Sequence, residues 1–143
     1  MNDTAIITGA SSGIGAATAE QFIAKGLSVI NIARRPSPVA GVVNVAADLG
    51  SDEGALRAAT ECKAHLAADG GRITLIHNAS LMLKDTANDC ETQALMRVMA
   101  VNVLAVNTLN RELIGSMAAG SSIIYVGSTL SEKAVSGAYS YVI

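Results

Sequence analysis

The chain of 143 residues is long enough to bury a hydrophobic core and short enough to form one domain. Half of its residues are hydrophobic and 15% are charged, with a formal net charge of −2. This composition excludes a disordered chain and gives no electrostatic basis for binding nucleic acid or an acidic membrane.

The cysteines and the hydropathy pattern narrow the class of protein further. Cys62 and Cys90 show no C-x-x-C spacing, and only His65 and His77 could join them, so we expect neither a disulfide nor a metal site. This cysteine usage fits a reducing, cytoplasmic setting. No apolar stretch is long enough to span a bilayer, and we therefore expect no membrane-spanning helix.

The first predicted elements are a strand over residues 5–7 and a helix over residues 16–25. They are joined by the glycine-rich turn Thr8-Gly9-Ala10-Ser11-Ser12-Gly13-Ile14-Gly15. Such a turn holds a pyrophosphate, because free backbone N–H groups and the positive end of the helix dipole face the anion. Gly9 would permit the turn, Gly13 would let the backbone approach the phosphates, and Gly15 would let the helix pack closely.

The spacing of these glycines separates the nucleotide-binding classes. Three residues lie between Gly9 and Gly13, which excludes the common G-x-G-x-x-G fingerprint, and no Gly-Lys-Ser/Thr follows to form a P-loop. The alternative is a turn whose glycines and serines only cap the helix. The pattern T-G-x-x-x-G-x-G resembles the short-chain dehydrogenase/reductase family, in which this segment binds a nicotinamide dinucleotide. The resemblance implies that the cofactor contacts Gly9, Ser11, Ser12, Gly13, Ile14 and Gly15.

A second strand is predicted over residues 27–33, and Arg34 and Arg35 follow it. A right-handed crossover places this strand beside the first, with its carboxyl end near the adenosine ribose of a dinucleotide. An acid there would suit the 2′-hydroxyl of NAD, whereas the planar donors of arginine suit a 2′-phosphate. We therefore predict a preference for NADP(H) over NAD(H). The alternative is a pair of solvated arginines at a strand exit.

The third strand is predicted over residues 42–47, because residues 37–41 are too few and too rich in proline to form a helix. In the family that this chain resembles, an Asp followed by an apolar residue at this strand end contacts the adenine. The resemblance gives that role to Asp48 and Leu49, although Asp48 could equally be a turn residue. Ser51 is then the predicted N-cap of a helix that runs to about residue 68.

The fourth strand is predicted over residues 72–76, and His77-Asn78-Ala79-Ser80 follows it. The family often has Asn-Asn-Ala-Gly here, at the wall of the nicotinamide side of the cleft. Asn78 and Ala79 match that pattern, whereas His77 and Ser80 depart from it. We interpret His77 as a hydrogen-bonding residue at the strand end, because the resemblance gives this position no acid–base role. Residues 81–91 are predicted to be irregular.

One long helix is predicted over residues 92–117. It is apolar around most of its girth, and between Ala94 and Val106 only Arg97 and Asn102 are polar, so something besides one sheet must cover it. An amide in such a run needs hydrogen-bond partners. The resemblance implies that Asn102 holds a water in a proton relay, and the alternative is a structural amide that kinks the helix.

The fifth strand is predicted over residues 121–127, with Ser128 at its end and Tyr141 thirteen residues later. The resemblance implies that Ser128 orients a substrate carbonyl and that Tyr141 exchanges a proton with it during hydride transfer. In the family a Lys four residues after the Tyr assists this step, and the sequence ends at Ile143 before that position.

Together these elements predict an α/β fold, a Rossmann-type doubly wound parallel sheet of about five strands in the order 3-2-1-4-5. Residues 1–143 would form a single dinucleotide-binding domain, incomplete at its C-terminus. The resemblance implies hydride transfer between NADP(H) and a small carbonyl or alcohol, with little turnover by this N-terminal portion alone. A non-catalytic dinucleotide-binding or interaction module is the alternative. The apolar helix and the outer edge of the fifth strand predict a homodimer or a higher homo-oligomer.

Overall fold

A computed structural model describes residues 3–66, 70–133 and 135–143 of the chain. Its parallel strands form one sheet in the order β3-β2-β1-β4-β5, which confirms the predicted fold class and strand order. Their bounds are β1 Thr4–Thr8, β2 Ser28–Ala33, β3 Val43–Ala46, β4 Ile73–His77 and β5 Ser122–Tyr125. The strand order reverses between β1 and β4, and folds of this type bind ligands at the carboxyl ends of the strands beside such a point.

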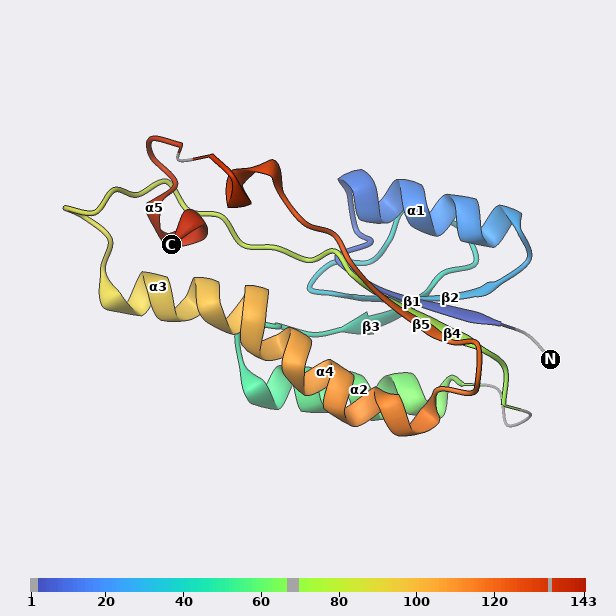
Figure 1. Cartoon of the computed structure of the whole chain (residues 1–143). Helices are drawn as coiled ribbons and strands as arrows, with labels where there is room; N and C mark the ends of the chain where they lie inside the picture. The colour runs from blue at the N-terminus through green and yellow to red at the C-terminus, as the bar shows by residue number, and fades with distance from the viewer. Residues whose placement is uncertain (1–2, 67–69, 134) are drawn as a thin grey trace.

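Helices cover both faces of the sheet (Figure 1). The α-helices are α1 Gly13–Ala24, α2 Asp52–Ala64, α3 Thr92–Met99, α4 Ala105–Leu113 and α5 Tyr139–Val142. On one face α1 packs against β1 and β2, while α2 and α4 pack side by side on the other. Beyond the carboxyl ends of the strands, α3 and the C-terminal helix α5 contact each other. This end of the molecule holds the residues predicted to bind the cofactor and the substrate.

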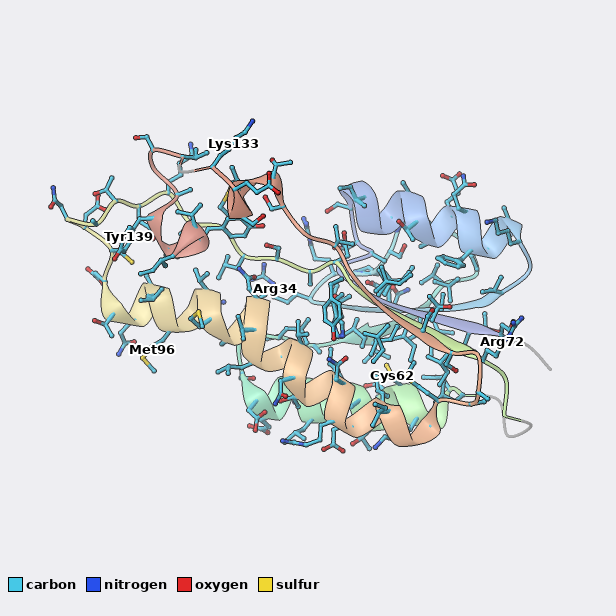
Figure 2. All side chains as sticks on the ribbon, viewed as in Figure 1. Arg34, Cys62, Arg72, Met96, Lys133 and Tyr139 are labelled. Atoms are coloured by element: carbon cyan, nitrogen blue, oxygen red, sulfur yellow. The ribbon has the colours of Figure 1, made fainter. Side chains whose placement is uncertain are left out.

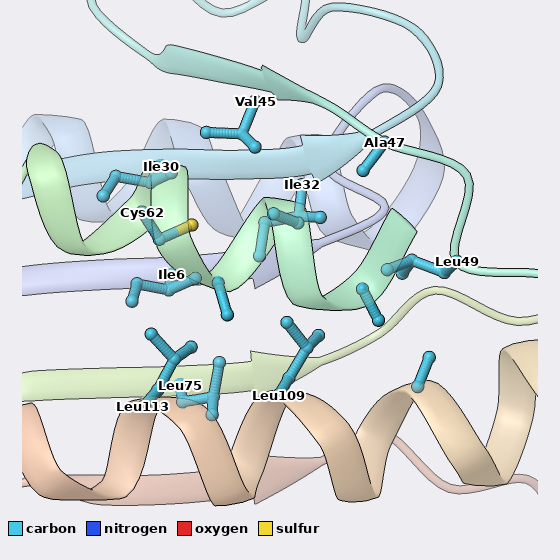
Figure 3. Packing of buried hydrophobic residues seen from close by; sticks show 14 of the residues in the cluster. Ile6, Ile30, Ile32, Val45, Ala47, Leu49, Cys62, Leu75, Leu109 and Leu113 are labelled. Atoms are coloured by element: carbon cyan, nitrogen blue, oxygen red, sulfur yellow. The ribbon is translucent and has the colours of Figure 1, made fainter. Parts of the chain in front are cut away.

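Two hydrophobic clusters, one on each face, hold the layers together. The larger cluster joins strand residues such as Ile6 and Leu75 to Leu109 and Leu113 of α4 and to Cys62 of α2 (Figure 3). The smaller cluster lies under α1 and consists of Ala5, Ile7, Ala10, Ala19, Val29 and Ile76. Because β1 contributes to both clusters, its side chains are buried on both faces, as expected for a central parallel strand.

The long helix predicted over residues 92–117 is not regular. A π-helical stretch, η1 (Ala100–Leu104), separates α3 from α4, and a 3₁₀ turn, η2 (Ile114–Ser116), ends the run. The outer face of this run remains uncovered by the chain itself, as predicted. The large hydrophobic side chains exposed along this run are Met96 at 65%, Met99 at 43%, Val103 at 47%, Leu104 at 58% and Ile114 at 59%. Figure 2 shows Met96 on the side of α3 that faces away from α5.

Two further predictions concern the connections of the sheet. Residues 34–42, between β2 and β3, form bends and a turn without a helix, as expected. In α2 the Ser51 hydroxyl caps the helix by accepting a hydrogen bond from the Gly54 amide at 3.0 Å. The helix ends at Ala64, and the end predicted at residue 68 lies outside the described residues. Among the residues that the structure describes, no helix is long and apolar enough to cross a membrane.

Candidate functional site

The glycine-rich turn closes tightly against the residues that follow β4. Gly9 has a φ of 75°, and a Cβ added to it would lie 3.0 Å from the Cα of Ala79. A Cβ on Gly15 would collide with the Gly9 carbonyl and the Asn78 amide, so this position also requires glycine. Gly13 has a φ of 55° and open space around it, which leaves room for a ligand to approach the backbone.

Asn78 and Thr8 lock the ends of β4 and β1 together. The Asn78 side-chain amide donates to the carbonyls of Thr8 at 3.1 Å and Gly9 at 3.2 Å. In return, the Thr8 hydroxyl accepts from the backbone amides of Asn78 at 3.0 Å and Ala79 at 2.9 Å. Asn78 therefore supports the turn that is predicted to hold the pyrophosphate, in addition to lining the cleft beside it.

The start of α1 bears on the two interpretations of the turn. Ser12 is the N-cap residue, but its side chain makes no capping hydrogen bond, and Ile14 is 66% exposed. The first N–H groups of a helix have no partner within the helix. The Ser12 hydroxyl accepts no hydrogen bond from these N–H groups, so the structure gives no support to Ser12 as a capping side chain. The arrangement of free donors fits a pyrophosphate.

A cleft of about 330 Å³ lies beside this turn. It brings together eight of the residues predicted to bind the cofactor: Gly9, Ser11, Ser12, Arg34, Arg35, Leu49, Asn78 and Ala79. Figure 2 labels Arg34 near the carboxyl ends of the strands. The other predicted residues, Gly13, Ile14, Gly15 and Asp48, are not among those that line the cleft.

A second cavity of about 500 Å³ adjoins the cleft, and the two share Ala79 and Ser80 in their walls. All three residues predicted to be catalytic, Asn102, Ser128 and Tyr141, line this second cavity. The structure thus brings a predicted carbonyl-orienting hydroxyl and a predicted proton donor to one space beside the cleft.

The local contacts of two of these residues are structural. The Ser128 hydroxyl accepts from the Leu130 amide at 3.2 Å and so caps the 3₁₀ turn η3 (Thr129–Ser131). The Asn102 side chain accepts from the backbone amide of Leu81 at 2.8 Å and donates to its carbonyl at 2.9 Å. Because Asn102 lies within η1, these contacts agree with the structural alternative for this amide.

Comparison with known proteins decides the family. The model of the short chain dehydrogenase family matches residues 3–142. The chain belongs to this family.

Curated relatives include the short chain dehydrogenase ausX of Penicillium brasilianum, 38% identical over 142 residues, which cover 92% of this chain and 54% of that protein. Dihydromonapterin reductase of Klebsiella pneumoniae is 33% identical over 138 residues, or 90% of this chain and 56% of that protein. This short chain dehydrogenase sequence thus spans about half the length of the curated relatives it matches.

Among solved structures, an oxidoreductase of the same family from Brucella ovis, in complex with a partially ordered NAD, superimposes with a TM-score of 0.88. It is 27% identical, and the match covers 99% of this chain and 70% of that one. Ligand-free aldohexose dehydrogenase of Thermoplasma acidophilum, 23% identical, shares the fold with a TM-score of 0.87 over 99% of this chain and 55% of its own.

In this short chain dehydrogenase chain, Asp48 is held by its own neighbours. One carboxylate oxygen accepts from the Gly50 amide at 2.9 Å, and the other lies 3.8 Å from the guanidinium of Arg97. Arg97 comes from α3 and lines the cleft together with Val101, which the sequence analysis did not predict. A single arginine in an otherwise apolar helical run was the signal that could have identified it.

Tyr141 is held in the second cavity through an acid that the sequence analysis also missed. Asp85 is buried, and one of its carboxylate oxygens accepts from the Ser140 amide at 2.9 Å. The Asp85 backbone accepts from the Tyr139 amide at 3.1 Å and donates to the Gly137 carbonyl at 3.2 Å. Hydrogen bonding by Ser140 holds the pKa of the Asp85 carboxyl below its usual value. Asp85 therefore anchors the short helix α5.

His77 has the hydrogen-bonding role predicted for it. Its Nε2 lies 2.8 Å from the side-chain oxygen of Asn110, whose amide nitrogen donates to the Tyr125 hydroxyl at 2.9 Å. The rings of His77 and Tyr125 stack with centroids 5.3 Å apart. Burial lowers the pKa of His77, which favours the neutral imidazole in this cluster.

Cys62 belongs to the scaffold, whereas Cys90 is half-buried in the irregular segment before α3. Cys62 is buried in the larger core cluster, and burial raises the pKa of its thiol to about 12. Within the described ranges 3–66, 70–133 and 135–143, no three His, Cys, Asp or Glu residues are grouped so that they could hold a metal ion.

Proposed function

We propose that this chain is the dinucleotide-binding part of an NADP(H)-preferring short chain dehydrogenase. The whole protein would transfer a hydride between the nicotinamide and a small carbonyl or alcohol substrate. The observation that carries this proposal is the pair Arg34 and Arg35, which follows β2 and lines the same cleft as the glycine-rich turn. No acidic side chain stands at this strand end to accept the 2′-hydroxyl of NAD.

The residues of the cleft fit such a cofactor. The first N–H groups of α1 and the hydroxyls of Ser11 and Ser12 would hold the pyrophosphate, favoured by the positive end of the helix dipole. The guanidinium groups of Arg34 and Arg35 would bind the 2′-phosphate through charge-assisted hydrogen bonds. Leu49 would lie against the adenine, with Asp48 beside it.

The second cavity would be the place of reaction. Bound NADP(H) supplies or accepts the hydride. The Ser128 hydroxyl would donate to the substrate carbonyl, and the Tyr141 hydroxyl would give a proton to the carbonyl oxygen or take one from an alcohol. Asn102, which also lines this cavity, would support the proton relay that the family resemblance implies.

Further proposals concern the assembly and its setting. We assign cofactor binding to these 143 residues and expect them alone to turn over little substrate, since they span about half of their relatives. The outer face of α3 and η1 (Met96, Met99, Val103 and Leu104) would pair with its copy in a homodimer, in a cytoplasmic setting. Sedimentation should then show a dimer that Val103→Glu dissociates, and a monomer at tens of micromolar would refute the pairing.

Calorimetric titration with NADPH and NADH tests the cofactor preference. Wild-type chain should bind NADPH at least about tenfold more tightly, because two charge-assisted contacts contribute on the order of 1.5–3 kcal/mol each. The double variant Arg34→Ala/Arg35→Ala should lose this preference while its affinity for NADH stays unchanged. The matched control Arg57→Ala/Arg111→Ala removes two exposed arginines that do not line the cleft. Equal affinities of the wild-type chain for both cofactors would refute the proposal.

A further inference from the structure

Asn31 is a polar residue at the centre of a buried strand. It lies in β2 between Ile30 and Ile32, and its side chain is 0% exposed. Burying an amide costs free energy unless its donors and acceptor are paired. Its partners therefore indicate why an amide, rather than an aliphatic side chain, occupies this position.

Those partners belong to three separate segments. The Asn31 oxygen accepts from the backbone amide of Ala10, in the glycine-rich turn, at 2.9 Å. Its nitrogen donates to the carbonyl of Arg35 at 3.2 Å and to the side-chain oxygen of Asn44, in β3, at 3.0 Å. The same Asn44 oxygen accepts from the amide of Ser37 at 2.8 Å. One buried amide thus joins the turn to the arginine segment (Arg34 and Arg35), and Asn44 holds Ser37 just after this segment.

We propose that Asn31, supported by Asn44, is a positioning residue that sets the spacing between two anion-binding segments of the cofactor site. This inference rests on the proposed function, in which the turn holds the pyrophosphate and Arg34 and Arg35 bind the 2′-phosphate. In NADP(H) the pyrophosphate and the 2′-phosphate are attached to the same adenosine. The turn and the arginine segment must therefore lie at a fixed spacing for both anions to bind at once. NAD(H) has no 2′-phosphate, so it places an anion only at the turn and none at Arg34 and Arg35.

The two cofactors therefore respond differently to loss of this network. If the arginine segment shifts relative to the turn, NADPH loses the benefit of binding two sites simultaneously, whereas NADH loses little. A purely structural amide would act otherwise, lowering stability and affecting both cofactors alike. The ratio of the two affinities is thus the readout that separates a positioning role from a structural one.

Asn44→Ala tests the network at its exposed end, where the variant removes the acceptor shared by Asn31 and Ser37 without disturbing the core. Asn31→Leu tests it at its buried centre, with a side chain of similar volume. The control is Thr108→Val, because the buried Thr108 hydroxyl donates to Asp52 at 2.8 Å and neither residue lines the cleft. Each variant is titrated with NADPH and NADH by calorimetry, and its thermal unfolding is measured.

We expect the ratio of NADPH to NADH affinity to fall at least about fivefold in Asn44→Ala and Asn31→Leu, with a smaller change in NADH affinity. Thr108→Val should lower the unfolding temperature and leave the ratio unchanged. If Asn31→Leu does not fold, Asn44→Ala decides. The inference is overturned if Asn44→Ala keeps the wild-type ratio of NADPH to NADH affinity, or if Thr108→Val lowers this ratio equally. The proposed function survives that outcome as long as Arg34→Ala/Arg35→Ala loses the preference for NADPH. A wild-type chain without a preference overturns the proposed function as well.

Discussion

β1 and β5 belong to the same parallel sheet, yet they lie in different environments. Every residue of β1 is buried, and the strand pairs with β2 on one side and β4 on the other. β5 pairs with β4, and its residues Ile124 and Tyr125 are 44% and 59% exposed. The strand that leads into the glycine-rich turn is thus stabilised by the core of this chain, whereas the strand that leads to Ser128 leaves apolar side chains uncovered.

The largest effect expected from this contrast is on the free energy of unfolding. Ile6→Ala removes a fully buried side chain from β1 and should lower the free energy of unfolding by about 2–5 kcal/mol. The matched substitution Ile124→Ala, on the exposed strand β5, should cost less than about 1 kcal/mol, because much of this side chain already contacts solvent. Urea denaturation measures both. Equal losses would show that β5 is covered as well as β1, for example by a second copy of the chain.

The next effect concerns the end of the cleft that is proposed to hold the adenosine. Arg97 is paired with Asp48 at 3.8 Å, so the pair is nearly neutral and suits an uncharged base better than a phosphate. Arg97→Ala should therefore weaken NADPH and NADH binding by the same factor, about three- to tenfold, in a calorimetric titration. Arg57→Ala serves as the control. Weaker binding of NADPH alone would place Arg97 with Arg34 and Arg35, which are proposed to bind the 2′-phosphate.

The smallest expected effect is pH dependence of the helix α5, which carries Tyr141 beside the second cavity. The pKa of Asp85 is lower in the folded chain than in an unfolded one, where it is near 3.9. Its contribution to stability is therefore complete above about pH 4 and is lost as the pH falls through the lower, folded-state pKa. Amide hydrogen exchange at Tyr139 and Ser140 should accelerate in that window before exchange in β1 does. Asp85→Asn should remove this pH dependence, and an unchanged profile in that variant would exclude Asp85 as its source.

The sheet and the glycine-rich turn could be predicted from the sequence because their signals are local, whereas the binding of a dinucleotide by this turn stays a prediction. Short β-branched runs indicate buried strands, and the spacing of Gly9, Gly13 and Gly15 limits the ligand class. The order of the strands then follows from the handedness of the crossovers and from the family resemblance. The convergence of Ser128 and Tyr141 on one cavity agrees with the roles that the resemblance implies, and those roles remain predictions.

The features that the sequence analysis missed depend on contacts between distant residues. Asn31 reaches the turn 21 residues away, and Asp85 reaches Ser140 across 55 residues. Neither has a periodic pattern around it that would reveal a partner. The π-helical stretch around Asn102 was missed for the same reason, because apolar spacing gives no sign of the contact between Asn102 and Leu81. Arg97 was visible as an isolated charge, but its partner Asp48 was not.

The helix-free connection between β2 and β3 affects how the chain folds. Parallel strands are usually joined by a crossover of about a dozen residues or more, whereas residues 34–42 alone join this pair. Closing a shorter loop costs less conformational entropy, so β2 and β3 can pair before distant segments meet. β1, by contrast, must find β4, in a register that pairs Thr4 with Ile73. We therefore expect that long-range closure, rather than closure of the loop over residues 34–42, to limit the folding rate of this sheet.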